Sequence, residues 1–118
     1  MKIDDFFADF HESQVLFDHL LDKIKAIDPF TIHVSKSQIA FKRQKTFAII
    51  WIPARYLHSK SAPLVLTMSF PYRHNSPRWK EIVEISTRHF THHLELYTNK
   101  DIDHEVCEWI LQAWANAT

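Results

Sequence analysis

The sequence contains no glycine in 118 residues. Glycine lets a backbone take positive φ or approach a bound phosphate closely. Its absence excludes the Gly-rich phosphate loop, the dinucleotide-binding fingerprint and the nucleophile elbow of α/β-hydrolases, because each of these motifs needs it. Turn positions with positive φ must fall to other residues, such as Asn75 and Asn99.

Cysteine is almost as scarce, since Cys107 is the only one. A single cysteine excludes an internal disulfide and favours a reducing, cytoplasmic compartment. Cys107 lies among apolar residues of an expected helix, so we expect a buried structural thiol rather than a nucleophile. No apolar run approaches the roughly 20 residues that span a bilayer, and the acidic start lacks the order of a signal peptide. We therefore expect no membrane partner.

The sequence does contain enough apolar material, 46%, for one compact domain over residues 1–118. Its central stretch predicts two adjacent strands joined by a cationic turn at residues 42–46. In the first strand, Ile39 and Phe41 alternate with polar or small residues and so share one face. Residues 47–52 are apolar on both faces, which predicts a central strand covered on both sides or nearly so. The turn is either a solvated tip or an anion-facing loop.

Helical patterns flank this hairpin. Residues 3–9 predict a helical turn, and residues 13–27 predict a helix capped by Ser13 with apolar residues spaced by three and four. A closing helix is expected to begin at Asp101 or Asp103. Further strands are expected at residues 31–35, 64–70, 81–85 (an edge strand) and 90–97. This order predicts an α+β fold: a mostly antiparallel five- or six-stranded sheet with an N-terminal and a C-terminal helix packed on one face.

Charge is unevenly distributed although the net charge is zero. Residues 1–30 carry three Lys and seven acids (−4), and residues 101–118 carry four acids without Lys or Arg (−4). Residues 31–100 carry eleven Lys and Arg against three Glu (+8). If the acidic helices cover one face of the sheet, the opposite face and its loops should be positive and favour an acidic partner. The alternative is that acidic helices simply complement a basic sheet.

The strand alternation predicts which polar side chains line that opposite face. A nucleic acid or an acidic protein is the expected partner of a non-enzymatic binding module built on it. Aromatic residues beside cations, at Tyr72–Arg73 and Arg78–Trp79, suit stacking on bases, although no known RNA-binding consensus or helix-turn-helix pattern is present. The candidate binding residues are Lys36, Gln38, Lys42, Arg43, Lys45, Arg73, Arg78, Arg88, His93 and Tyr97.

Nine histidines leave an alternative open. Alternation sends His92 to the apolar face, where we expect it to be buried and hydrogen-bonded, and sends His93 and Glu95 to the other face. This pair suggests a metal-binding or enzymatic domain, but two residues make no complete ligand set. No catalytic residue, metal ligand set or cofactor is therefore predicted. A third reading is a structural domain that is a monomer or a homodimer joined through a sheet edge.

Residues 35–48, together with 92–96 and 101–114, resemble the pattern of the bacterial DUF5655 family (domain of unknown function). The resemblance extends over about residues 10 to 117. It departs from the family pattern in the glycine-free turn and at Phe90, where tryptophan is expected. The resemblance implies a small α+β domain, found alone or at the end of larger proteins, some similar to predicted nucleases and some labelled as transport proteins. It brings no catalytic residues. A more distant similarity to YdhG-like domains implies iron handling, against which the few acidic ligands argue.

Overall fold

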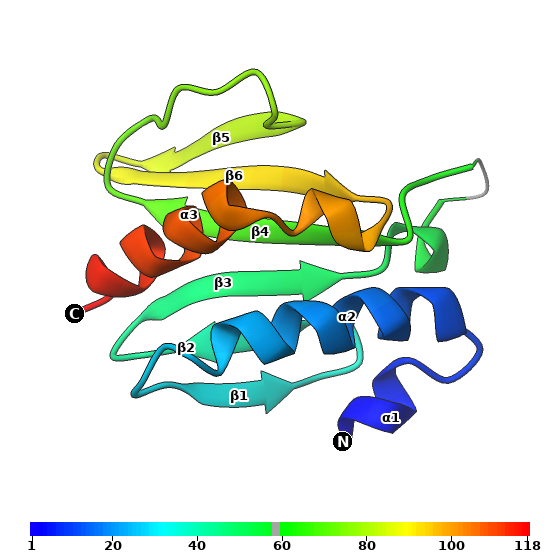
Figure 1. Cartoon of the computed structure of the whole chain (residues 1–118). Coiled ribbons are helices and arrows are strands. Elements are labelled where there is room, and N and C mark those ends of the chain that lie inside the picture. The colour runs from blue at the N-terminus through cyan, green and yellow to red at the C-terminus, as the bar shows by residue number, and fades with distance from the viewer. Residues whose placement is uncertain (58–59) are drawn as a thin grey trace.

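The computed structural model describes residues 1–57 and 60–118 (Figure 1). One antiparallel sheet has the strand order β1-β2-β3-β4-β6-β5. The α+β fold expected from the sequence is confirmed. The strands are β1 (Thr31–Val34), β2 (Ile39–Lys42), β3 (Thr46–Trp51), β4 (Leu64–Phe70), β5 (Glu81–Ser86) and β6 (His89–Leu96). The helices are α1 (Ile3–Phe6), α2 (His11–Ile24) and α3 (His104–Ala115), with the 3₁₀ turns η1 (Pro53–Arg55) and η2 (Asn99–Asp101).

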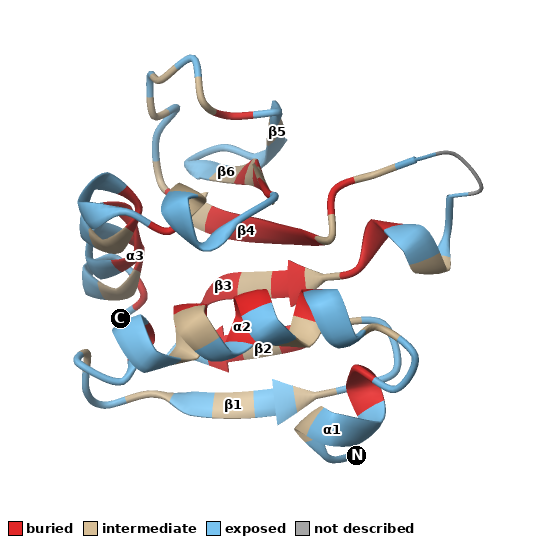
Figure 2. Cartoon of the chain, turned by 45° about the vertical axis from the view of Figure 1, so that its right-hand side comes forward, coloured by how far each residue is buried: buried red, intermediate tan, exposed pale blue. Residues whose placement is uncertain are grey.

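Helices α2 and α3 lie side by side on one face of the sheet (Figure 1). Their apolar stripes meet alternate side chains of the strands, and burial is concentrated where the helices face β3 and β4 (Figure 2). Helix α2 contributes Leu16, Phe17, Leu20 and Ile24, and α3 contributes Val106, Trp109, Ile110 and Ala113. The alternation of apolar residues in the sequence thus selects the face that the helices cover. Among the described residues, no helix is both long and apolar enough to cross a membrane.

Local details correct several sequence-based expectations. Ser13 does not cap α2, which begins at His11 after Phe10. Instead, the buried Ser13 hydroxyl donates a 2.6 Å hydrogen bond to the carbonyl oxygen of Pro63 and ties α2 to the start of β4. Asp103 does cap α3, because its carboxylate accepts the backbone N–H of Val106.

The left-handed backbone positions also differ from expectation. In the described residues, positive φ occurs at Asp9 (71°) and Arg88 (62°), not at Asn75 or Asn99. Aspartate often takes this conformation, because its short side chain hydrogen-bonds locally, but arginine has no such compensation. Arg88 is therefore held in a strained conformation by the tight connection between β5 and β6.

The expectation that β3 is covered on both faces, or nearly so, is met in full on one face and only in part on the other. Its inner side chains, including Ala48 and Ile50, lie in the core. Ile49 and Trp51 point to the other face, where no α-helix of the described residues covers them, and both stay partly exposed. The apolar pattern of β3 therefore reflects a core on one side and an apolar surface on the other.

Candidate functional site: an open sheet face and a basic groove

The face of the sheet away from α2 and α3 is here called the open face. The strand register shows which residues belong to the open face, because partners across adjacent strands point to the same side. One row crosses the sheet through His33, Ala40, Ile49, Thr67, His93 and Glu81, which pair in that order. A second row joins Trp51, Val65 and Glu95, and a third joins Ser69, Thr91 and Val83.

The open face is acid-free over four of its six strands. Residues 29 to 80 hold nine Lys and Arg and no Asp or Glu, and this segment forms β1 to β4. The carboxylates of the open face therefore come only from β5 and β6, as Glu81 and Glu95. Glu95 lies 3.8 Å from Lys80 Nζ. Positive charge without local carboxylates thus belongs to the β1–β4 half.

A groove of about 720 Å³, here called the basic groove, lies where the open face ends. The β2–β3 turn, the end of β4, the β5–β6 turn and the end of α3 meet there, at the left of Figure 1. Its lining includes Lys45, Arg88 and His89 and contains no Asp or Glu. Its polar residues are Thr46, Ser69, Thr91 and Asn116, and its apolar residues are Ile49, Phe70, Pro71, Ile85, Ala113 and Ala117. Cations beside hydroxyls over an apolar floor suit an organic molecule that carries phosphate or another anion.

The cations of the basic groove are available to a ligand. In the described residues, neither the Lys45 ammonium nor the Arg88 guanidinium forms an ion pair or a side-chain hydrogen bond. The carbonyl of Ala117 at the groove accepts the backbone N–H groups of Gln44 and Lys45, at 3.1 and 3.0 Å. These two bonds occupy a carbonyl oxygen that would otherwise repel an anion, and they fix the position of Lys45.

Three of the predicted binding residues are placed elsewhere. Arg43 stacks over the Trp114 ring at 3.8 Å and donates to the Trp114 carbonyl oxygen at 3.3 Å, so it joins the hairpin turn to α3. Arg73 lies over the ring of Phe90, which is paired with Phe70 on the helix side of the sheet. Arg78 is bound to the start of α3.

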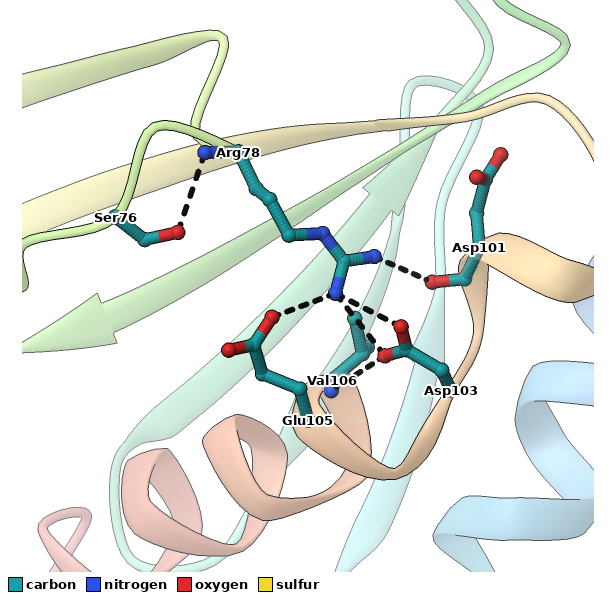
Figure 3. Close-up of polar contacts among 6 residues, drawn as sticks. All are labelled: Ser76, Arg78, Asp101, Asp103, Glu105 and Val106. Carbon is teal, nitrogen blue, oxygen red and sulfur yellow. Dashed lines mark hydrogen bonds and ion pairs between the residues drawn. The ribbon is translucent and has the colours of Figure 1, made fainter.

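The Arg78 guanidinium is the centre of a polar cluster (Figure 3). It donates to the carboxylates of Asp103 and Glu105 at 3.0 and 2.8 Å and to the Asp101 carbonyl at 3.1 Å. Burial opposes ionisation, yet the bonds from Val106 N–H and Arg78 lower the pKa of Asp103 overall. Arg78 therefore positions the loop before β5 on the N-terminus of α3.

Of the two aromatic–cation pairs predicted to stack on bases, Arg78–Trp79 forms no surface platform, whereas Tyr72 and Arg73 remain exposed. Trp79 is buried against Trp109, with ring centroids 4.4 Å apart, and Arg78 lies over the same Trp109 ring at 5.4 Å. Tyr72 stacks on Phe70 beside this cluster. The loop between β4 and β5 thus packs on the helix side and supplies structure there.

His92 and His93 lie on opposite faces, as alternation predicts. His92 is buried, accepts the backbone N–H of His74 at Nε2 (2.9 Å), and has Nδ1 3.2 Å from the Phe90 carbonyl. Because a carbonyl only accepts, Nδ1 carries the proton and the ring is neutral. Burial lowers the pKa of His92, in agreement with this assignment. The predicted buried and hydrogen-bonded histidine is confirmed.

On the open face, Trp51, Thr67 and His93 form a chain of hydrogen bonds. The indole Nε1–H donates to Thr67 Oγ1 at 3.3 Å, and this oxygen lies 2.7 Å from His93 Nδ1. Since an indole only donates, the hydroxyl accepts from Trp51. A hydroxyl has one proton and two acceptor lone pairs, so its bond to His93 Nδ1 forms in either direction, according to the tautomer of His93. Burial lowers the pKa of His93, while the nearby Glu81 opposes this shift. The chain fixes the orientation of both rings.

The remaining predicted residues lie at separate parts of the sheet. Lys42 is on the open face beside the basic groove, whereas Lys36, Gln38 and Tyr97 lie at the opposite end, near Trp51. His93 and Glu95 share the open face as expected, but no three His, Cys, Asp or Glu side chains in residues 1–57 and 60–118 converge as metal ligands. Trp51, Thr46, His89 and Asn116 were not among the sequence candidates. The acid-free segment and the two-sided apolar pattern of β3 were the signals that point to this region.

Comparison with protein-family models matches residues 3–117 to the family described as "Domain of unknown function (DUF5655)". The match extends from the first turn of α1 to the residue whose carbonyl binds the β2–β3 turn. No curated protein and no solved structure matches the chain.

Proposed function

We propose, for this member of the DUF5655 family, that the chain is a non-enzymatic binding module that holds a phosphate-bearing polyanion in the basic groove. The observation that carries the proposal is a concave site with Lys45, Arg88 and His89 in its lining and no carboxylate. The acidic helices are confined to the other face, so they leave this end of the sheet positive. A cytoplasmic location, favoured by the single cysteine, is part of the proposal.

The strain at Arg88 supports a role in ligand binding. A left-handed arginine costs about 1 kcal/mol that asparagine or glycine would avoid. The conformation lies at the tip of the β5–β6 turn, in the lining of the groove. The presence of arginine in this strained conformation is therefore better explained by its guanidinium, which binds phosphate oxygens in a fork, than by the turn.

Binding of inorganic polyphosphate tests the proposal. Titration calorimetry at low salt should show binding that weakens steeply with salt, because each phosphate contact releases counterions. The double charge reversal Lys45→Glu/Arg88→Glu should reduce the affinity at least about tenfold, since two contacts become repulsive.

A matched control is available on the same chain. Lys25 follows α2 on the helix side, and Lys100 lies in η2 at the opposite end of the sheet from the groove. Both are exposed, so Lys25→Glu/Lys100→Glu changes the net charge equally without touching the groove. Equal losses in the two double variants would show only net charge attraction and would refute a groove-specific site.

A further inference from the structure

Trp51 lies flat on the open face. Its cross-strand partner on β4 is Val65, yet its indole N–H reaches Thr67, two residues further along β4. A ring standing upright from β3 would not reach that short side chain, so the indole extends across the strands. Val65 and Thr67 are only 4% and 6% exposed, on a face that no α-helix of residues 1–57 and 60–118 covers, which agrees with a ring lying over them.

The indole is therefore a fixed aromatic plate. Its N–H is bound by Thr67, whose hydroxyl is in turn oriented by His93 at 2.7 Å, and Tyr56 packs beside it with centroids 6.5 Å apart. Tyr56 and Tyr97 are exposed near the same end of the sheet. Fixing the ring before a ligand arrives lowers the entropy cost of stacking.

The plate and the basic groove are two ends of one surface. Ser69 in the groove and Val65 under the indole are four residues apart on β4, which corresponds to about 13 Å. Ile49 on β3 and Thr67 on β4 are cross-strand partners and lie between these two ends. A ligand that uses both ends must place a flat ring at one end and an anion at the other, and must pass the partly exposed Ile49 between them.

Charge defines the path of such a ligand. Lys42 and Lys45 lie at the groove end of the β1–β4 half, and Lys36 lies at the Trp51 end. The open-face carboxylates, Glu81 and Glu95, are on β5 and β6. A chain of phosphates is therefore attracted over β2 to β4 and by Arg88 in the β5–β6 turn, and it is repelled by Glu81 and Glu95 further along β5 and β6.

We infer that the polyanion of the basic groove is a single-stranded nucleic acid, whose phosphates contact Lys45 and Arg88 while one unpaired base stacks on Trp51. This inference rests on the proposed function, because it names the ligand of the same groove. Paired bases do not offer a free face to a flat indole, so a duplex does not satisfy both ends. Polyphosphate has no base, so it can bind the cations of the groove but cannot stack on Trp51.

The test is fluorescence anisotropy with a labelled oligothymidine, a labelled duplex of equal length and inorganic polyphosphate as a competitor. Trp51→Ala should weaken binding of the oligothymidine roughly 5- to 150-fold, as loss of a base-stacking side chain does elsewhere. It should leave the affinity for polyphosphate unchanged. Trp51→Phe keeps an aromatic face and should retain most of the binding to single strands.

Control variants separate stacking from folding. Thr67→Val keeps the shape of the floor but removes the acceptor of the indole N–H, so it should weaken single-strand binding less than Trp51→Ala does. Thermal unfolding of each variant shows whether the protein remains folded at the assay temperature. If Trp51→Ala is too unstable, Thr67→Val compared with the wild type on oligothymidine and polyphosphate gives the same contrast with a smaller amplitude.

The outcomes distinguish the inference from the proposed function. Loss of oligothymidine binding in Trp51→Ala with unchanged polyphosphate binding supports the inference. Equal affinity of Trp51→Ala and the wild type for oligothymidine, or tighter binding of the duplex, overturns it while leaving the groove intact. Absence of binding to all three ligands at low salt overturns both. If only Lys45→Glu/Arg88→Glu loses binding of both oligothymidine and polyphosphate, the groove is the binding site and Trp51 is not part of it.

Discussion

The two faces of the sheet use the same residue types for opposite purposes. On the helix side, Arg43 and Arg78 contact α3 through Trp114, Asp103 and Glu105. On the open side, Lys45 and Arg88 line the basic groove and have no ion pair within the described residues. The sequence places Lys42, Arg43 and Lys45 within four positions of one turn. The comparison teaches that packing against a helix, not the local density of cations, decides which cation lacks a protein partner and can bind a ligand.

The largest expected difference between the faces is in the response to tryptophan truncation. Trp109→Ala removes a buried ring stacked on Trp79 and should lower the free energy of unfolding by about 3–5 kcal/mol. Trp51→Ala removes a partly exposed ring and should cost less than about 2 kcal/mol. Denaturant unfolding measures both. A larger loss for Trp51→Ala would mean that the indole is a core residue rather than a surface plate.

A smaller contrast is expected between Arg78 and Lys45. Arg78→Met removes the cation that two carboxylates and a carbonyl share, and should cost about 1–2 kcal/mol, because these side chains are partly exposed. Lys45→Met should change stability by no more than about 0.5 kcal/mol, as expected for a surface substitution without partners. Thermal unfolding checks both values. Equal losses would contradict the assignment of Arg78 to structure and of Lys45 to ligand binding.

Each face carries one histidine whose pKa is lowered by burial, His92 on the helix side and His93 on the open face. Substitution of His92 tests the contribution of the helix side to acid sensitivity. Burial lowers the pKa of His92 in the folded protein, helped by the charges of His74 and Arg73. Below about pH 6.5 the unfolded chain takes up a proton that the native ring does not, so stability falls as the pH decreases towards the folded-state pKa. His92→Gln keeps an acceptor for His74 N–H and a donor for the Phe90 carbonyl. It should therefore make this part of the stability curve less steep, while the contribution of His93, whose pKa burial also lowers, remains.

Chemical denaturation at a series of pH values measures this effect. Carboxylates with a lowered pKa, such as Asp103, lose their contribution at lower pH, below about 3.9, so the two effects are separable. The quantity compared is the slope of the unfolding free energy against pH just below pH 6.5. If this slope is the same in His92→Gln and in the wild type, His92 does not contribute to it.

The smallest expected effect is a gain in stability. Arg88→Asn places a residue that tolerates φ of 62° at the β5–β6 turn and should stabilise the fold by about 0.5 kcal/mol. The same variant should weaken polyphosphate binding, because a cation of the groove is lost. Thermal unfolding and calorimetry on one preparation test both parts. A stabilised variant with full polyphosphate affinity would separate the strain at Arg88 from ligand binding.

Much of the fold follows from patterns that the sequence shows directly. Alternation in residues 64–70 predicts β4, spacing in residues 16–24 predicts the buried stripe of α2, and Asp103 predicts the start of α3. Ser13 is a misleading signal. A serine near the start of a helix matches the preference for the N-cap position, but here its hydroxyl donates to the distant Pro63 carbonyl instead. Local pattern fixes which element forms, but not the partner of each polar group.

The candidate site could be predicted only in part. The sequence by itself determined a glycine-free α+β chain with a cationic middle, and alternation separated His92 from His93. Only the tertiary structure decided that Arg43, Arg73 and Arg78 serve the helix side, that Lys45 meets Arg88 and His89 across a groove, and that Trp51 lies over Thr67. The physical reason is that charge and periodicity are properties of a segment, whereas a site depends on segments distant in sequence that packing brings together.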